Sequence, residues 1–192
     1  MKRQFVAVLS TVLTLVTVSL PTHAVELGIN GHQGTERETQ GYEIYVTDNF
    51  SRRSPFYWRL GLSRYNDVFV EWNGSELEFP MNHAEAALSY RHPLFARSPT
   101  MRRLSFEFQA GAAVSLTENK FTWAELDEEK YFSESGDISA FVALSAHYKV
   151  SSNISASLGI KHFPDMSEFG SISSAFLGVK FNFNFGPTYY GN

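Results

Sequence analysis

The sequence predicts an all-β fold, an eight-stranded, antiparallel, up-and-down transmembrane β-barrel that follows a cleaved signal peptide. Three observations predict this fold: an N-terminal targeting segment, eight later segments in which apolar and polar residues alternate, and connections that are alternately long and short. Alternation with a period of two is typical of strands, because successive side chains point to opposite faces of a sheet.

Residues 1–24 predict a secretory signal peptide. Lys2 and Arg3 precede an apolar run that ends at Pro21, and Ala24 occupies a small-residue position suited to cleavage. The run is shorter than the roughly 20 residues that a membrane-spanning helix needs. The sequence therefore predicts two parts, a signal peptide over 1–24 and an outer-membrane barrel domain over 25–192.

Composition narrows the class of protein further. The 192-residue chain has no cysteine, 15% aromatic residues and a formal net charge of −4. The lack of cysteine excludes a disulfide scaffold and a cysteine-ligated metal site, and the aromatic content argues against a disordered chain. The acidic balance argues against a nucleic-acid binder. No nucleotide-binding or hydrolase motif is present, so no cofactor and no resident metal ion are expected.

The first four strands are expected over residues 25–32, 41–48, 56–65 and 82–91. Each has an apolar face set against a polar one. The apolar faces are Val25, Leu27 and Ile29 in the first segment; Tyr42, Ile44 and Val46 in the second; Phe56, Trp58, Leu60 and Leu62 in the third; and Ala84, Ala86, Leu88 and Tyr90 in the fourth.

The last four strands are expected over residues 103–115, 137–149, 153–162 and 172–185, where the alternation is cleaner. Their apolar faces include Phe106, Leu144, Leu158 and Val179. Phe141 and Phe176 are exceptions, since they fall on the polar face. Segments of about ten residues match the length that a tilted membrane-spanning strand needs.

The polar face indicates that the barrel is apolar outside and polar inside. It carries Ser, Gly, Ala and Asn with isolated charges, whereas a soluble surface carries more charge. Small residues suit the narrow bore of an eight-stranded barrel. The charges on this face have both signs, and we expect them to pair in the lumen as a charge network: Glu43, Arg59, Glu85, Arg91, Glu107, Lys161 and Lys180.

Connection lengths and aromatic residues agree with this orientation. The first, third, fifth and seventh connections, about 33–40, 66–81, 116–136 and 163–171, are generally longer than those between them. Membrane barrels have long outer loops, short periplasmic turns and aromatic girdles at both interfaces. Aromatic residues gather at strand ends, as in 56–58 and in the last segment, which ends at Phe185.

In these features the chain resembles the small bacterial outer-membrane barrels of the OmpX and OmpA transmembrane-domain type. The resemblance covers the whole chain after residue 24, and it is one of pattern. It implies a monomer in the outer membrane of a Gram-negative cell envelope, in contact with outer-membrane lipids and lipopolysaccharide, that is inserted by the barrel-assembly machinery. Unlike that family, the chain continues past its last aromatic strand, through residues 186–192.

A second resemblance concerns residues 159–167, GIKHFPDMS, followed by 177–179, LGV. This stretch is loosely similar to the C-terminal region of PagL-type lipid A deacylases. Those enzymes have a lipid-facing Ser-His-acid triad, and the similarity places its histidine at His162. The family's serine, two positions after the histidine, is Pro164 here, and its asparagine is Asp165. The resemblance therefore implies His162 as base, whereas its nucleophile does not carry over. By the outward parity of the next strand, Ser171 and Ser173 are the serines that could approach His162 across the hairpin.

Two further groups have a functional and a structural interpretation. The connection at 116–136 is acidic, through Glu125, Asp127, Glu128 and Glu129 among others. These carboxylates either engage divalent cations or a basic partner, or simply keep an outer loop solvated. His83 and His147 fall on the polar face, where they are either switches and ligands or interior hydrogen-bond partners.

The sequence therefore predicts an outer-membrane barrel with a structural or surface-interaction role, one that is neither an enzyme nor an open porin. Two alternatives remain open. The first is a PagL-like lipid A deacylase that hydrolyses an ester-linked acyl chain of lipopolysaccharide. The second is a periplasmic, lipocalin-like binder with an apolar bore.

Overall fold

The structure, a computed structural model, describes residues 24–35, 39–51, 54–72, 74–93, 101–123, 128–166 and 169–184. Eight strands form the barrel wall: β1 (Ala24–Gly34), β2 (Gln40–Asn49), β3 (Phe56–Trp72), β4 (Ser75–Pro93), β5 (Leu104–Ser115), β8 (Ile138–Lys149), β9 (Ile154–Phe163) and β10 (Ile172–Asn184). A separate two-stranded sheet consists of β6 (Asn119–Trp123) and β7 (Glu128–Ser133).

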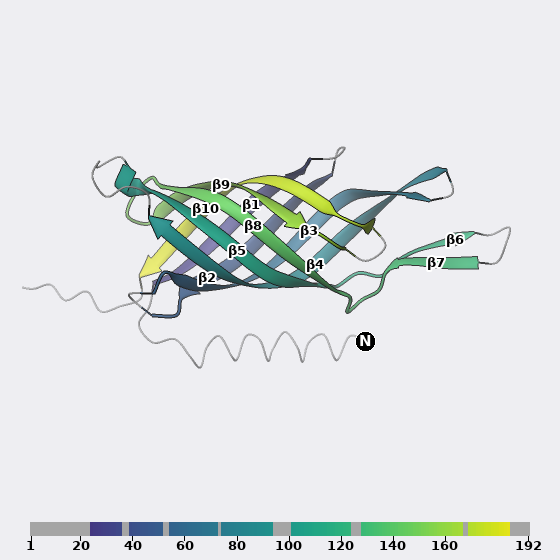
Figure 1. Ribbon diagram of the computed structural model, residues 1–192, viewed down its shortest axis with the longest axis horizontal. Helices are drawn as coiled ribbons and strands as arrows, with labels where there is room; N and C mark the ends of the chain where they lie inside the picture. Colours follow the sequence, from purple (N-terminus) through teal and green to yellow (C-terminus); the bar gives the residue numbers. More distant parts are fainter. Residues whose placement is uncertain are drawn as a thin grey trace, which may run out of the picture.

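The wall is closed, and every neighbouring pair of strands is antiparallel (Figure 1). Around the barrel the order is β1, β10, β9, β8, β5, β4, β3 and β2, so β1 pairs with β2 on one side and with β10 on the other. Closure leaves no strand edge in the wall, which is what lipid requires because it offers no hydrogen bonds to the backbone. The predicted eight-stranded, up-and-down barrel is confirmed.

The apolar face points outward, as predicted. Phe106, Leu144 and Val179 are 43%, 50% and 39% exposed, whereas Glu43 and Glu107, on the opposite face, are each 1% exposed. Large apolar side chains exposed all around a closed barrel are typical of a wall that faces acyl chains. A lipocalin-like binder needs the reverse orientation, so that alternative is wrong.

Phe141 and Phe176, the two exceptions to the alternation, point into the lumen. They are 2% and 4% exposed, and neither disturbs the register of its strand, since Phe141 lies opposite Gly111 and Phe176 opposite Gly159. Each therefore places a ring beside a glycine of the next strand, where the missing side chain leaves room.

Both termini of the barrel and the β2–β3, β4–β5 and β8–β9 connections lie at one end, and the projecting β3–β4 and β6–β7 hairpins lie at the other. We refer to these as the periplasmic end and the outer end, following the arrangement of membrane barrels. At the periplasmic end, a 3-10 helix, η1 (Met101–Arg103), leads into β5. No helix among the described residues is long and apolar enough to cross a membrane.

At the outer end, the strands continue where connections were predicted. β3 and β4 extend through 66–81, and β6 and β7 form a hairpin within 116–136. A bulge between Tyr65 and Val68 places Asp67 at a φ of 54°. Such bulges bend a strand and increase its twist, and Asp tolerates this conformation better than most residues. The bulge thus lies where the hairpin leaves the barrel wall.

The predicted signal peptide lies outside the described residues except for Ala24, which begins β1. Its cleavage stays a prediction. Phe185 and the tail over 186–192 also lie outside the described residues.

Candidate functional site

The periplasmic half of the lumen contains a group of four charges, which we call the inner charge cluster: Glu26, Arg91, Glu107 and Lys180. Arg91 Nη2 lies 2.9 Å from Glu26 Oε2 and 2.8 Å from Glu107 Oε2. Lys180 Nζ lies 3.4 Å from both of these carboxylates. Each cation therefore bridges both acids, and the four residues come from four different strands.

A second group, the outer charge cluster, lies further toward the outer end: Glu43, Arg59, Glu85 and Lys161. Arg59 Nη2 donates to Glu43 Oε1 at 2.6 Å, and Lys161 pairs closely with Glu85 and lies 3.9 Å from Glu43. All four residues are buried. As in the inner charge cluster, two acids face two bases, so neither cluster carries a formal net charge.

Balance matters because burying an unpaired charge is costly, and good geometry with satisfied hydrogen bonds is needed to offset desolvation. Additional partners meet this need. Ser63 Oγ donates to Glu85 at 2.6 Å, Asn30 Nδ2 donates to Glu43 at 3.0 Å, and Gln109 Nε2 donates to Glu107 at 2.7 Å.

All seven residues that the sequence predicted for the lumen lie on its inner face, arranged as two clusters rather than one network. Glu26 was not predicted as a member. Its position on the polar face of the first strand was the signal that could have identified it, since it shares that face with Gly28 and Asn30.

Tyr45 separates the two clusters. The Arg59 guanidinium stacks on its ring, with 3.3 Å between the guanidinium carbon and the ring centroid. The ring covers Gly28 so closely that any side chain at that position would overlap it. Gly28 therefore creates the space in which this cation–π contact forms.

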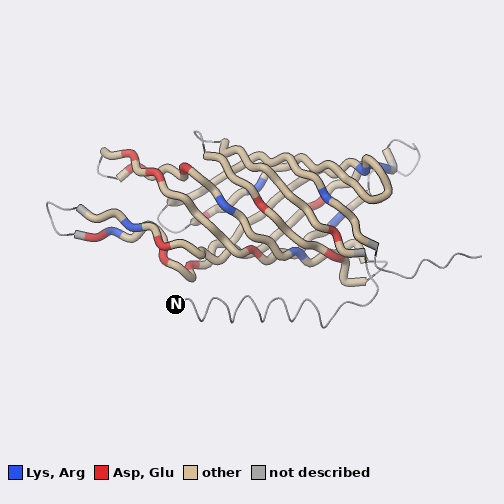
Figure 2. Tube along the Cα trace, turned by 180° about the vertical axis from the view of Figure 1, so that it is seen from behind, with Lys and Arg blue, Asp and Glu red and all other residues tan. Residues whose placement is uncertain are grey.

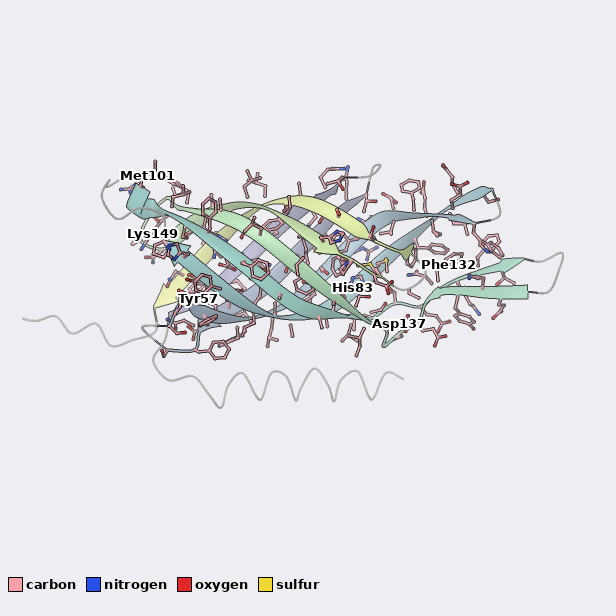
Figure 3. All side chains as sticks on the ribbon, in the orientation of Figure 1. Tyr57, His83, Met101, Phe132, Asp137 and Lys149 are labelled. Carbon is pink, nitrogen blue, oxygen red and sulfur yellow. The ribbon has the colours of Figure 1, made fainter. Side chains whose placement is uncertain are left out.

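Beyond the outer charge cluster the lumen is apolar. A set of buried side chains, which we call the apolar plug, fills it at this depth: Tyr65, Val68, Met81, Ala113, Phe141, Phe163 and Met166. His83 lies where the plug meets the charges and packs against the rings of Tyr65 and Phe163, with centroid distances of 6.2 and 6.0 Å. Figure 3 shows its side chain inside the barrel, near the outer end.

Two hairpins project beyond the barrel at the outer end, and we call them together the outer lobe: residues 66–81 of β3 and β4, and the β6–β7 hairpin (Figure 1). An aromatic seam joins them to the β9–β10 connection through Trp72, Phe79, Phe121, Phe132 and Phe169, with ring centroids 5.2–6.2 Å apart. Because Phe132 is only 1% exposed, the seam is a packed core outside the membrane.

The outer lobe and its surroundings are acidic, as Figure 2 shows. Carboxylates on described side chains there are Asp67, Glu71, Glu76, Glu78, Glu118, Glu129, Glu134, Asp137 and Asp165; the cations are Arg64, Lys120 and Lys130. Of the predicted acidic residues, Glu125 and Asp127 lie outside the described residues, and only the backbone of Glu128 is described. Glu129 pairs with Lys120 at 3.3 Å, and this hydrogen bond raises the pKa of Lys120.

His162 and Ser173 meet on the outward face near the outer end. The β9–β10 register pairs the two residues directly, and His162 Nδ1 lies 2.8 Å from Ser173 Oγ. Ser171 precedes β10 and makes no contact with His162, although it lines a cavity of about 210 Å³ together with Ser173 and Phe169. Within the described ranges, no carboxylate contacts His162, so the third member of a triad is not identified.

His147 is buried like His83, and its Nε2 lies 2.9 Å from Ser145 Oγ and 3.3 Å from Glu107 Oε2. Both histidines therefore lie in the lumen, as their parity predicted. Over the described part of the chain, no group of three or more metal-binding side chains could hold a metal ion.

Comparisons with known proteins find the fold but no close relative. No family model matches the sequence, and no curated protein matches it. Among solved structures, the chain is similar to the N-terminal β-barrel domain of Pseudomonas aeruginosa OprF, with a TM-score of 0.55, 16% identity, and coverage of 83% of this chain and 97% of that one.

Two other membrane barrels are similar. Neisserial surface protein A matches with a TM-score of 0.53, 11% identity, and coverage of 85% of this chain and 98% of that one. The Yersinia pestis outer membrane protein Ail, in a phospholipid bilayer nanodisc, matches with a TM-score of 0.53, 12% identity, and coverage of 84% and 99%. At these identities the likeness shows the fold: a small, eight-stranded outer-membrane β-barrel. With its apolar exterior, this fold places the chain in the outer membrane.

Proposed function

We propose that this protein is a non-conducting outer-membrane barrel whose outer lobe binds a basic partner at the cell surface. The observation that carries the proposal is the aromatic seam, which packs two projecting hairpins into one body above the lumen. A packed core outside the membrane contributes nothing to spanning lipid, whereas it does hold a recognition surface in a fixed shape.

The charge of the outer lobe supports a basic partner. Glu71 and Glu76 lie directly across from each other in the β3–β4 hairpin, and Glu78 lies on the same face. Acidic side chains gathered on one face create a negative potential, which attracts and orients a cationic partner. Asp137 and Asp165 line a separate surface cavity beside Phe132 and add to the negative potential.

The filled lumen supports the absence of a transport role. Two neutral charge clusters and the apolar plug lie one above the other along the bore. An ion entering from the periplasmic end would have to displace paired charges and then pass a dry, aromatic layer, and both steps are costly.

Binding of a lysine-rich peptide to the protein in zwitterionic nanodiscs tests the role of the outer lobe. We expect salt-sensitive binding that weakens at least tenfold in Glu71→Gln/Glu76→Gln/Glu78→Gln. A glutamate-rich peptide of the same length, and the variant Lys149→Gln at an exposed position of the opposite end, provide controls. Equal binding by the triple variant and the parent protein would exclude the proposal.

A second candidate is a lipid A deacylase, and it rests on the hydrogen bond between His162 and Ser173. In this reaction Ser173 Oγ would attack the ester carbonyl while His162 accepts its proton. The sugar hydroxyl would then leave with that proton, and water would hydrolyse the acyl-serine. A nucleophile–base contact on the lipid-facing side of the wall suits an acyl chain that arrives through the membrane.

Fatty-acid release from purified lipopolysaccharide tests this candidate. A deacylase predicts release that is abolished in both His162→Ala and Ser173→Ala and retained in Ser171→Ala, because Ser171 does not touch the histidine. The absence of released fatty acid from the folded protein removes the candidate and leaves the outer-lobe proposal unaffected.

A further inference from the structure

The periplasmic mouth of the barrel contains a pocket of about 180 Å³ that the proposed function does not use. Its lining includes Arg103 from η1, Ser105 at the start of β5, and His147 and Lys149 at the end of β8, beside residues of β1, β4, β9 and β10. Figure 3 shows Lys149 at this end of the barrel, far from Phe132 in the outer lobe. The pocket thus faces the periplasm and is open to small solutes.

Two cations of the pocket lie side by side. Leu104 and Tyr148 form the last pair of the β5–β8 ladder, Lys149 ends β8, and Arg103 is the last residue of η1, directly before β5. Both cations line the pocket together with the inward-facing residues Ser105 and His147. Like charges opposite each other repel, and this arrangement is stabilised when an anion lies between them.

The acid that lines the pocket, Glu26, and the neighbouring Glu107 are already neutralised. Glu26 and Glu107 each pair with Arg91 and with Lys180, at 2.8–3.4 Å, so the inner charge cluster has no net charge. Neither Arg103 nor Lys149 forms an ion pair with a described carboxylate. The mouth therefore carries two positive charges that nothing in the described part of the chain offsets.

A buried imidazole completes the pocket. Nε2 of His147 lies 3.3 Å from the Glu107 carboxylate, which can only accept, so this nitrogen is assigned the proton. Nδ1 is then an acceptor, and it is buried without a hydrogen-bond partner although His147 lines the pocket. A buried acceptor on a residue of a pocket that two cations also line calls for a ligand that carries both negative charge and a hydroxyl group.

We propose that this pocket binds a phosphate group in its hydrogen-phosphate or monoester form. The charged oxygens would face Arg103 and Lys149, and the P–OH would donate to His147 Nδ1. Ser105 and Ser152, which also line the pocket, supply further donors. Sulfate has the same shape and charge but no proton at neutral pH, so the site distinguishes the two anions. The group comes either from free phosphate or from the phosphomonoester headgroup of an inner-leaflet lipid.

The test follows the imidazole signals of His147 by NMR in ¹⁵N-histidine-labelled protein, in phosphatidylcholine nanodiscs, during titration with inorganic phosphate. We expect a saturable shift, with sulfate binding at least tenfold more weakly. Phosphate affinity should fall at least tenfold in Arg103→Gln/Lys149→Gln. The matched control Lys120→Gln/Lys130→Gln changes two lysines at the other end and should leave affinity unchanged.

Nanodiscs containing phosphatidic acid, compared with phosphatidylglycerol, identify the source of the phosphate. Loss of the phosphate response only with phosphatidic acid indicates a lipid headgroup, whereas an unchanged response indicates a soluble ligand. Heat-modifiable gel migration verifies that each variant is folded. No saturable shift with phosphate, equal affinity for sulfate, or full affinity in the double variant would overturn the proposal.

Discussion

The two halves of the lumen are filled by opposite means. Toward the periplasm, paired charges occupy the bore, and each acid of the inner charge cluster contacts two cations. Toward the outer end, the apolar plug around Phe141 and Phe163 occupies it. The charged half depends on complete pairing and the apolar half on volume, so substitutions in the two halves should differ in size and in kind.

The largest expected effect is in the charged half. Glu107→Leu leaves Arg91 and Lys180 with fewer partners in a buried site, and losing one partner of a buried pair costs about 3–5 kcal/mol. Urea titration of the folded protein in lipid vesicles should show this loss. Glu129→Leu, in the outer lobe, should change the unfolding midpoint very little. If both variants unfold with the parent protein, the pairing is not what stabilises this half.

A smaller effect is expected from reversing the polarity of the wall itself. Leu144→Arg places a cation on the lipid-facing side, where the cost near the bilayer midplane is about 2–4 kcal/mol. The matched variant Tyr148→Arg, on the same strand and face but at the periplasmic rim, should cost only about 0–1 kcal/mol. Vesicle refolding titrations measure both. An equal loss of folding free energy in both variants would contradict the placement of Leu144 near the bilayer midplane and of Tyr148 at its rim.

In the apolar half, a change of shape should be tolerated. Phe141→Leu keeps the plug apolar and removes only part of a buried ring, so its cost should stay well below the roughly 3–5 kcal/mol of a full Phe→Ala truncation. Differential scanning calorimetry in detergent detects the shift. Phe181→Leu, on the outward face, is the control and should have almost no effect, since lipid fills the space. A large loss of stability in Phe141→Leu would mean that the apolar plug tolerates substitution no better than the charge clusters do.

The smallest effect is expected at the exposed ion pair of the outer lobe. The side chains of Lys120 and Glu129 are 41% and 45% exposed, and such pairs contribute little to stability. Lys120→Gln should leave the urea midpoint unchanged. Titration of the labelled lysine should show that Glu129 holds the pKa of Lys120 above its ordinary value, and Glu129→Gln should restore that value.

The sequence predicted which face of the wall each residue occupies, but not which residues contact each other inside the lumen. Alternation predicted all eight wall strands and the inward position of residues such as Glu43 and Lys161, because parity along a strand determines the face. Parity does not determine depth or partners across the lumen. The sequence therefore did not reveal that Glu107 belongs with Glu26 while Glu85 belongs with Lys161.

The outer lobe was missed for a different reason. Residues 66–81 fall between the third and fourth alternating segments, so the sequence predicts them as a connection. In the structure Asp67 instead occupies a bulge within β3, and the hairpin is held by Trp72 and Phe79 packing against rings from β6, β7 and the β9–β10 connection. Such long-range packing has no periodic signal in the sequence. For the candidate deacylase site, the sequence predicted that His162 and Ser173 belong to one hairpin, and the β9–β10 register places them directly opposite each other.

The central claim is that this wall faces lipid on the outside while its lumen is filled along its length. Conductance across planar lipid bilayers tests it most directly, using protein whose folded state is verified by heat-modifiable gel migration. We predict no long-lived unitary conductance for the parent protein at moderate voltage. Stable, ohmic conductance steps from the folded protein would contradict the account.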